Sequence, residues 1–289
     1  MDYAPYNSEF IRRLSIYLNK IPDFVTGEIV SELVRDCRLS EKDAFLAAFA
    51  AGLGLSDEDR FEKVLIREYL PEAVTPLAAS GYRSDPYYAG VSFPAIRERD
   101  WEYKTESYAP YEVFVSDDFK TLPDGRVLPQ IGFFSERFDY PAVLEGGREW
   151  MTVTPNEINT MAPVIAGAEG DVLTFGLGLG YFAFMTARKD AVGSVTVVER
   201  DPAVIELFQK YLLPQFPCRD KIRVVREDAF AFASRELTPG RWSLVFTDLW
   251  HDPSDGVALW ERMRRYEGCA RGTRFAYWIE PTLRYYAAK

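Results

Sequence analysis

Histidine and cysteine are both scarce in this sequence of 289 residues. His251 is its one histidine, and its three cysteines, Cys37, Cys218 and Cys269, lie far apart. An odd number of cysteines without a metal-ligand spacing fits neither a disulfide framework nor a zinc site. We therefore expect reduced thiols, no bound metal and a cytoplasmic location.

Positive charge is also in short supply. The chain has 34 Lys and Arg against 44 Asp and Glu, which gives a formal net charge of −10 at pH 7. A protein that binds a phosphate backbone needs a basic face that displaces counterions. The composition therefore argues against nucleic acid as a partner.

Long apolar runs are missing as well. The first six residues lack the basic start and apolar core of a signal peptide, and the longest apolar run, Ala44 to Leu55, is too short to span a bilayer. We therefore expect no membrane partner. The 47% of hydrophobic residues still supports a real core, in one large domain or two ordinary ones.

The N-terminal quarter has the apolar spacing of helices. Between residues 8 and 70 apolar side chains recur three and four positions apart, and helix-start signals follow at Thr26, Ser40 and Ser56. We expect four short helices in an N-terminal helical domain over residues 1–75. This domain would be an accessory scaffold or, alternatively, a lid or partner surface.

Residues 76–150 have a different character. Prolines and tyrosines are frequent from Pro71 to Pro110, which indicates an ordered linker. Alternating apolar residues then predict a small antiparallel β region, with strands at 111–115, 126–128, 130–134 and 142–144.

Residues 151–289 are organised around a glycine-rich turn. The stretch from Asp171 to Met185 reads as a strand, a turn with Gly176, Gly178 and Gly180, and a helix. Glycine permits positive φ and close approach of a ligand, and the helix that follows presents free N–H groups. The turn would seat a polar or anionic small molecule, or alternatively it only bends the chain.

Acidic residues follow the next three predicted strands, at 194–199, 222–226 and 242–247. Glu199 lies 23 positions beyond Gly176, close to the roughly 20 expected for an acid that binds ribose hydroxyls. Asp228 and Asp248 follow the other two strands. Open parallel sheets bind ligands at these carboxyl ends. A fifth strand is expected at 274–279, so a seven-stranded sheet would be shortened or completed from elsewhere.

Together these residues resemble the class I S-adenosylmethionine-dependent methyltransferases, and within them the spermidine synthase branch, most closely over residues 171–250. The resemblance implies an α/β fold: a Rossmann-like, doubly wound, mainly parallel sheet over residues 151–289, preceded by the antiparallel β region and the helical domain. It implies S-adenosylmethionine as the cofactor, its methionine part at the glycines, its ribose at Glu199 and its adenine amine at Asp228. The implied cofactor-binding residues are Gly176, Gly178, Gly180, Glu199, Arg200, Asp228 and Ala229.

The acceptor side is expected on a helix and a loop. A helix should begin after Thr154, with Pro155 in its first turn. In the family a comparable helix borders the substrate, and Glu157 and Asn159 are the residues of this helix that could bind it. Trp250, in the loop after the fourth strand, is the further candidate for substrate binding. Alternatively, Glu157 is solvated on a packing helix.

The loop after the fourth strand carries the candidate catalytic residues Asp248, His251 and Asp252. A neutral imidazole at His251 could remove a proton from the acceptor. Carboxylates crowded at Asp248, Asp252 and Asp255 would favour a cationic acceptor such as an amine. Alternatively, Asp252 and Asp255 only start a helix.

Four functions remain open. The first is methyl transfer to a small molecule. The second is aminopropyl transfer from decarboxylated S-adenosylmethionine, but Leu179 stands where spermidine synthases carry the aspartate that holds the aminopropyl ammonium. The third is an NAD-dependent dehydrogenase, since Gly178, Gly180 and Ala183 fit G-x-G-x-x-A. The fourth is a nucleoside-binding protein without catalysis. A homodimer is an open alternative, because the sequence does not fix the oligomeric state.

Overall fold

The structure is a computed structural model, and it describes residues 2–289. The chain divides into two compact units, each with its own hydrophobic core. The first unit consists of Met1–Tyr82 and Ser107–Asp139, and the second of Arg83–Glu106 and Tyr140–Lys289. The domain boundaries expected after residues 75 and 150 stay a prediction.

The first unit begins with the expected helices. Their bounds are α1 (Ala4–Lys20), α2 (Gly27–Cys37), α3 (Glu41–Gly52), and α4 (Arg60–Val64) running on through a π-helical turn, η1 (Leu65–Tyr69), into α5 (Leu70–Ala73). Thr26 and Ser40 cap α2 and α3 through their hydroxyl oxygens, as predicted. Asp59 caps α4, in place of the start expected at Ser56.

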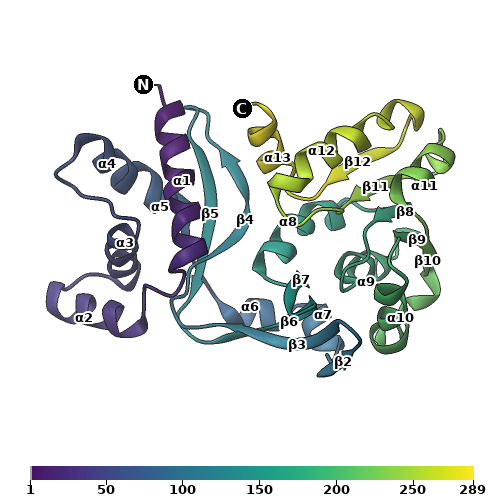
Figure 1. Ribbon diagram of the computed structural model, residues 1–289, viewed down its shortest axis with the longest axis horizontal. Helices are drawn as coiled ribbons and strands as arrows, with labels where there is room; N and C mark the ends of the chain where they lie inside the picture. The colour runs from purple at the N-terminus through teal and green to yellow at the C-terminus, as the bar shows by residue number, and fades with distance from the viewer. Residues whose placement is uncertain (1) are drawn as a thin grey trace. The chain divides into compact units, whose positions relative to one another are not determined.

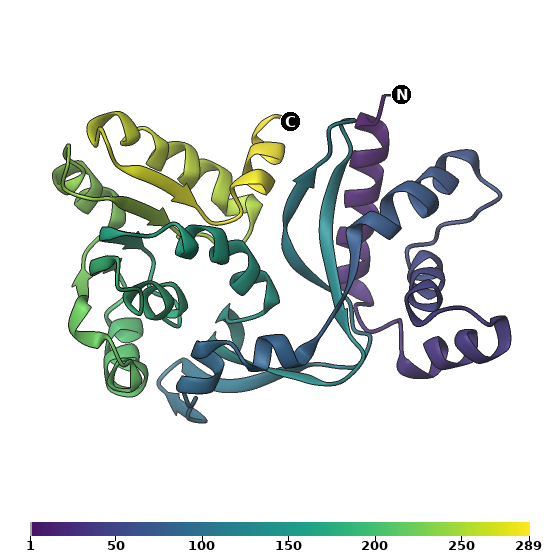
Figure 2. The ribbon, with the colours of Figure 1, turned by 180° about the vertical axis from the view of Figure 1, so that it is seen from behind.

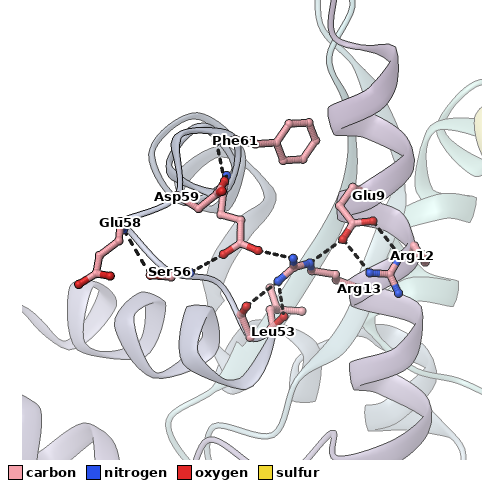
Figure 3. Close-up of polar contacts among 10 residues, drawn as sticks. Glu9, Arg12, Arg13, Leu53, Ser56, Glu58, Asp59 and Phe61 are labelled. Carbon is pink, nitrogen blue, oxygen red and sulfur yellow. Dashed lines mark hydrogen bonds and ion pairs between the residues drawn. The ribbon is translucent and has the colours of Figure 1, made fainter.

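A three-stranded sheet completes this unit, in the order β1 (Val74–Leu77), β5 (Val127–Phe134), β4 (Phe114–Thr121). Helix α1 lies along β5 in both views (Figures 1 and 2). Arg13 of α1 ties the helices together (Figure 3). It donates to Glu9 at 2.7 Å, to the Gly54 carbonyl at 2.6 Å and to Glu62. An apolar core and polar contacts such as those of Arg13 thus hold the unit together.

The expected linker is more structured than predicted. Between residues 76 and 110 the chain forms α6 (Ala79–Arg83), α7 (Pro86–Gly90), β2 (Ile96–Glu98) and β3 (Trp101–Tyr108). Strands β2 and β3 join β6 (Phe138–Glu145) and β7 (Arg148–Thr152) in a four-stranded sheet. The sequence did not predict these elements because the frequent tyrosines suggested a linker. Several of these tyrosines pack into the core instead, and Tyr87 and Tyr103 are both buried.

The second unit contains the predicted parallel sheet. Its order is β10 (Ile222–Arg226), β9 (Val192–Glu199), β8 (Gly170–Phe175), β11 (Leu244–Thr247), β12 (Arg274–Tyr277), with every neighbouring pair parallel. The chain moves outward from β8 in one direction and then, from β11, in the other. This is the doubly wound α/β arrangement, with its switch point between β8 and β11. The predicted fold class is confirmed.

Helices cover both faces of this sheet. They are α8 (Pro155–Ala166), α9 (Tyr181–Ala187), α10 (Pro202–Leu207), α11 (Ala229–Glu236), α12 (Pro253–Arg264) and α13 (Glu280–Ala287). Figure 1 shows α9 and α10 on one side of the sheet and α11 and α12 on the other, as right-handed crossovers require. The parallel sheet has five strands within residues 2–289.

Two further observations concern the cysteines and the length of the helices. Cys37, Cys218 and Cys269 are free thiols. None of the helices in residues 2–289 has both the length and the apolar character needed to cross a membrane.

Candidate functional site

A cavity of about 350 Å³ lies at the carboxyl edge of the parallel sheet, within the second unit. It sits beside the β8–β11 switch point, where open α/β sheets bind ligands. Ten of the residues proposed from the sequence line it: Glu157, Gly176, Gly178, Glu199, Arg200, Asp228, Ala229, Asp248, Trp250 and His251. Strand ends distant in the sequence therefore meet at one hollow.

The glycine turn is tight because the neighbouring backbone is close. Gly176 has φ +99°, and a Cβ there would lie 1.9 Å from the Asp248 carbonyl oxygen. Gly178 has φ +49°, and a Cβ there would lie 1.7 Å from the Met151 sulfur. Both positions need glycine for conformation and for space. Met151, which lies on β7, therefore covers part of the turn.

Gly180 and Asp252 are the two proposed residues outside this wall. Gly180 precedes α9, where a Cβ would lie 2.4 Å from the Phe208 ring, so its near neighbour is an aromatic side chain of the core. Asp252 is the N-cap of α12 and accepts from the Ser254 N–H at 2.6 Å. The structure thus places both beside the site and not in its wall.

Glu199 occupies the tip of β9 and folds back on its own backbone. One carboxylate oxygen accepts the N–H groups of Arg200 at 2.7 Å and Asp201 at 2.8 Å, and the other accepts that of Leu177 at 3.3 Å. A carboxylate offers about four acceptor positions. Backbone N–H groups occupy three of these positions. One hydroxyl of a ribose diol could donate to the fourth position, and the other could displace the long contact with the Leu177 N–H.

Asp228 follows β10 and caps α11. Its Oδ1 accepts the N–H groups of Phe230 at 3.0 Å and Ala231 at 2.9 Å. Both bonds use the same oxygen, which leaves Oδ2 for a donor such as an exocyclic amine. The buried Ala229 and Phe230 form an apolar surface beside it. This part of the wall suits a flat ring with one amino group.

The opposite part of the wall is acidic. Glu157 of α8 is only 9% exposed, and its Oε2 is buried without a hydrogen-bond partner among the described residues. Burial, followed by the charges of Asp248 and Glu149, holds the pKa of Glu157 well above its usual range. Burial also raises the pKa of Asp248 to about 7. Glu157 is therefore not the solvated side chain of a packing helix.

Bases are few in this wall. Besides His251 it contains Arg200, which is exposed, whereas the acids include Glu149, Glu157, Glu199, Glu227, Asp228, Asp248 and Asp255. Within residues 2–289 no three acidic, histidine or cysteine side chains are arranged to hold a metal ion. The charge of the wall thus favours an organic cation.

The loop after β11 gives His251 a partner that its position in the sequence did not reveal. Its Nδ1 lies 3.1 Å from Asp255 Oδ2. Burial raises the pKa of Asp255, but hydrogen bonds from the Asp252 N–H and from His251 outweigh it and leave that pKa below its usual value. The Trp150 ring contacts the imidazole, with centroids 4.7 Å apart. Asp255, for which the sequence left a helix start as one of two alternatives, lies in the first turn of α12 and also lines the cavity.

Sequence reasoning missed the contribution of β7. Glu149, Trp150 and Met151 all line the cavity from this strand. They precede the glycine turn by more than twenty positions, and no motif marks them. The buried Trp250 was proposed, and its indole Nε1 has no hydrogen-bond partner among the described residues. A buried donor without a partner is uncommon in folded proteins.

The strand order and the glycine turn at its switch point define an open, doubly wound α/β fold. No protein-family model matches the sequence, and no curated protein matches it. Similar solved structures do exist.

Three of these structures show the extent of the similarity. Precorrin 8W decarboxylase of Methanobacterium thermoautotrophicum is 19% identical, over 43% of this chain and 63% of its own length, with a TM-score of 0.33. Spermidine synthase of Thermotoga maritima is 16% identical, over 49% and 52%, with a TM-score of 0.35. A spermidine synthase in complex with the transition state analogue AdoDATO is 19% identical, over 49% and 54%, with a TM-score of 0.37. This chain thus matches about half to two thirds of their lengths, and the chemistry of the site rests on its own residues.

Proposed function

We propose that this protein is an S-adenosylmethionine-dependent methyltransferase whose acceptor is a small, positively charged molecule such as an amine. One observation carries the proposal: the glycine turn, Glu199 and Asp228 converge on a single cavity at the switch point of a doubly wound sheet. These groups match the three parts of an adenosyl cofactor, namely its chain, its ribose and its adenine.

The residues present fit this cofactor. Glu199 would accept the ribose hydroxyls, and Asp228 Oδ2 would accept the adenine amine against Ala229 and Phe230. The methionine part would lie along Gly176 and Gly178, in contact with the Met151 thioether. When bound, S-adenosylmethionine supplies a methyl group that its sulfonium already activates.

The chain's own residues would align and desolvate the acceptor. Glu157 and Asp248 present carboxyl groups from α8 and from the end of β11, and the Trp150 and Trp250 rings line the same wall. A cation relieves the repulsion between the two carboxylates and is attracted to indole faces. His251 stands beside them as the candidate proton acceptor.

Aminopropyl transfer is the second candidate, and the acidic wall favours it in one respect. Decarboxylated S-adenosylmethionine lacks the carboxylate that Glu157 and Asp248 would repel. Against it, Leu179 is 1% exposed and its carbonyl accepts the Tyr87 hydroxyl at 2.5 Å, so this side chain belongs to the core and offers no charge for an aminopropyl ammonium. Methyl transfer therefore remains the better-supported function.

Isothermal titration of the full chain with S-adenosylmethionine, its decarboxylated form and NAD tests the proposal. We expect S-adenosylmethionine to bind more tightly than the other two. Tighter binding of the decarboxylated form would transfer the assignment to aminopropyl transfer, and tighter binding of NAD to a dehydrogenase. Binding of S-adenosylmethionine without methyl transfer to any of a panel of primary, secondary and tertiary amines would support a nucleoside-binding protein.

A further inference from the structure

In the first turn of α12, the carboxylate of Asp255 contacts three nitrogen atoms of the loop that precedes the helix. Asp255 accepts the His251 N–H at 3.2 Å and the Asp252 N–H at 3.1 Å, and its Oδ2 lies 3.1 Å from the His251 ring nitrogen Nδ1. The capping box of α12 and the contact with the imidazole are thus made by the same side chain. The imidazole is thereby tied to the start of a helix.

The chemistry of a carboxylate decides the state of this ring. An ionised carboxylate can only accept hydrogen bonds, so the Nδ1 that contacts it must carry the hydrogen. A neutral imidazole carries one hydrogen, which leaves Nε2 with a free lone pair. The Trp150 ring packs edge-to-face against the imidazole, with ring centroids 4.7 Å apart and ring planes at 81°.

We propose that Asp255 is a positioning residue that holds His251 in the Nδ1–H tautomer, so that Nε2 accepts a proton from the acceptor molecule in the cavity. The transfer of a proton from the acceptor to Nε2 rests on the proposed function, whereas the tautomer of His251 does not. The proton leaves the acceptor's N–H or O–H bond, and the bonding electron pair stays on the acceptor atom, which becomes the nucleophile. The proton forms a new bond with Nε2, and the half-exposed imidazolium returns it to water.

Asp252 provides a matched control for Asp255. It is three residues away, belongs to the same capping box and carries the same charge, but its side chain accepts from Ser254 and does not line the cavity. Loss of either carboxylate weakens the start of α12. The loss of Asp255 alone removes the partner of the imidazole.

Nitrogen NMR of the full chain labelled with 15N-histidine tests the tautomer. His251 is the sole histidine, so the spectrum contains one imidazole. We expect a protonated Nδ1 and an unprotonated Nε2 in the parent protein and in Asp252→Ala, and a shift toward Nε2–H in Asp255→Ala. An Nε2–H tautomer in the parent protein would overturn the proposal, even if Asp255→Ala fails to fold.

Addition of propylammonium chloride tests the role toward the acceptor, with sodium chloride at the same concentration as the reference. We expect the Nε2 resonance to move and the Nδ1 resonance to stay. An unmoved Nε2 resonance would overturn that role. Titration with S-adenosylmethionine on the same sample decides the proposed function separately: no binding, with Nδ1–H present, would refute the methyltransferase and leave the pair of residues intact.

Discussion

Glu199 is the residue on which we expect cofactor binding to depend most directly. Its carboxylate lies at the tip of β9 and already accepts three backbone N–H groups. One hydroxyl of a ribose diol would donate to the remaining acceptor position of the carboxylate. The other would compete with the Leu177 N–H, whose hydrogen bond is the longest of the three. The side chain is therefore held in place before any ligand arrives.

Substitution of Glu199 tests this at the scale of one residue. We expect Glu199→Ala to weaken S-adenosylmethionine binding by about 1.5 to 3 kcal/mol, as for the loss of a charged hydrogen-bonding group. Isothermal titration measures the change. The control is Glu206→Ala, which removes the same charge from an exposed position of α10 outside the cavity. Equal affinities for the parent and Glu199→Ala would exclude Glu199 from the site.

At the scale of elements, two aspartates that follow neighbouring strands each cap the next helix. Asp201 follows β9 and caps α10, accepting from Ala203 at 2.7 Å and Val204 at 3.3 Å. Asp228 follows β10 and caps α11. Asp228 lines the cavity and Asp201 does not. One pair of substitutions therefore separates capping from ligand binding.

We expect Asp201→Ala and Asp228→Ala each to lower the free energy of unfolding by about 1 kcal/mol, the usual effect of removing an N-cap. Urea unfolding measures this loss. Asp228→Ala should in addition weaken S-adenosylmethionine binding, whereas Asp201→Ala should leave it intact. If both variants lost affinity equally, the effect would come from the helices and not from the Asp228 carboxylate.

The elements also show what the sequence could predict. Strand β10 occupies residues 222–226, as predicted. The capping of α11 by Asp228 was not predicted, because the same acid after a strand was assigned to the ligand. Strand β3 was missed because proline and tyrosine suggested a linker. Sequence also could not show that Asp255 faces the cavity while Asp252 does not, since both suit a first turn. That distinction depends on which way the loop bends.

At the scale of the whole molecule, the ionisation of Asp248 couples folding to pH. Burial raises the pKa of Asp248 from 3.8 to about 7 in the folded chain. Between these values the folded chain keeps a proton that the unfolded chain has released. The stabilisation is therefore complete below about pH 3.8 and is lost as the pH rises through about 7.

Urea unfolding at pH 5 and pH 8 tests this coupling. We expect the parent protein to lose more stability between these pH values than Asp248→Asn, which cannot ionise at this position. Because the charge of Asp248 also raises the pKa of Glu157, the difference between the two slopes reports Asp248 together with its effect on Glu157. Parallel slopes would mean that Asp248 ionises normally in the folded chain.

Ligand binding should also distinguish the two units of the molecule. Every residue that lines the cavity belongs to the second unit, and each unit has a core of its own. With S-adenosylmethionine present, we expect slower amide hydrogen exchange at β8, β9, β10 and β11, because a ligand stabilises the elements that it contacts. The reference is α1 to α3, where exchange should not change. Protection of α1 to α3 alone would place the ligand elsewhere.

Met151 has a consequence for which molecules can enter. The glycine turn offers only backbone to a ligand and therefore discriminates little between ligands of different size. The Met151 thioether, which lies next to Gly178, belongs to strand β7. An unbranched thioether can swing aside at small energetic expense, whereas a β-branched side chain is stiff. We therefore expect β7 to control ligand size, so that Met151→Ile would narrow the range of molecules that enter while every glycine of the turn stays in place.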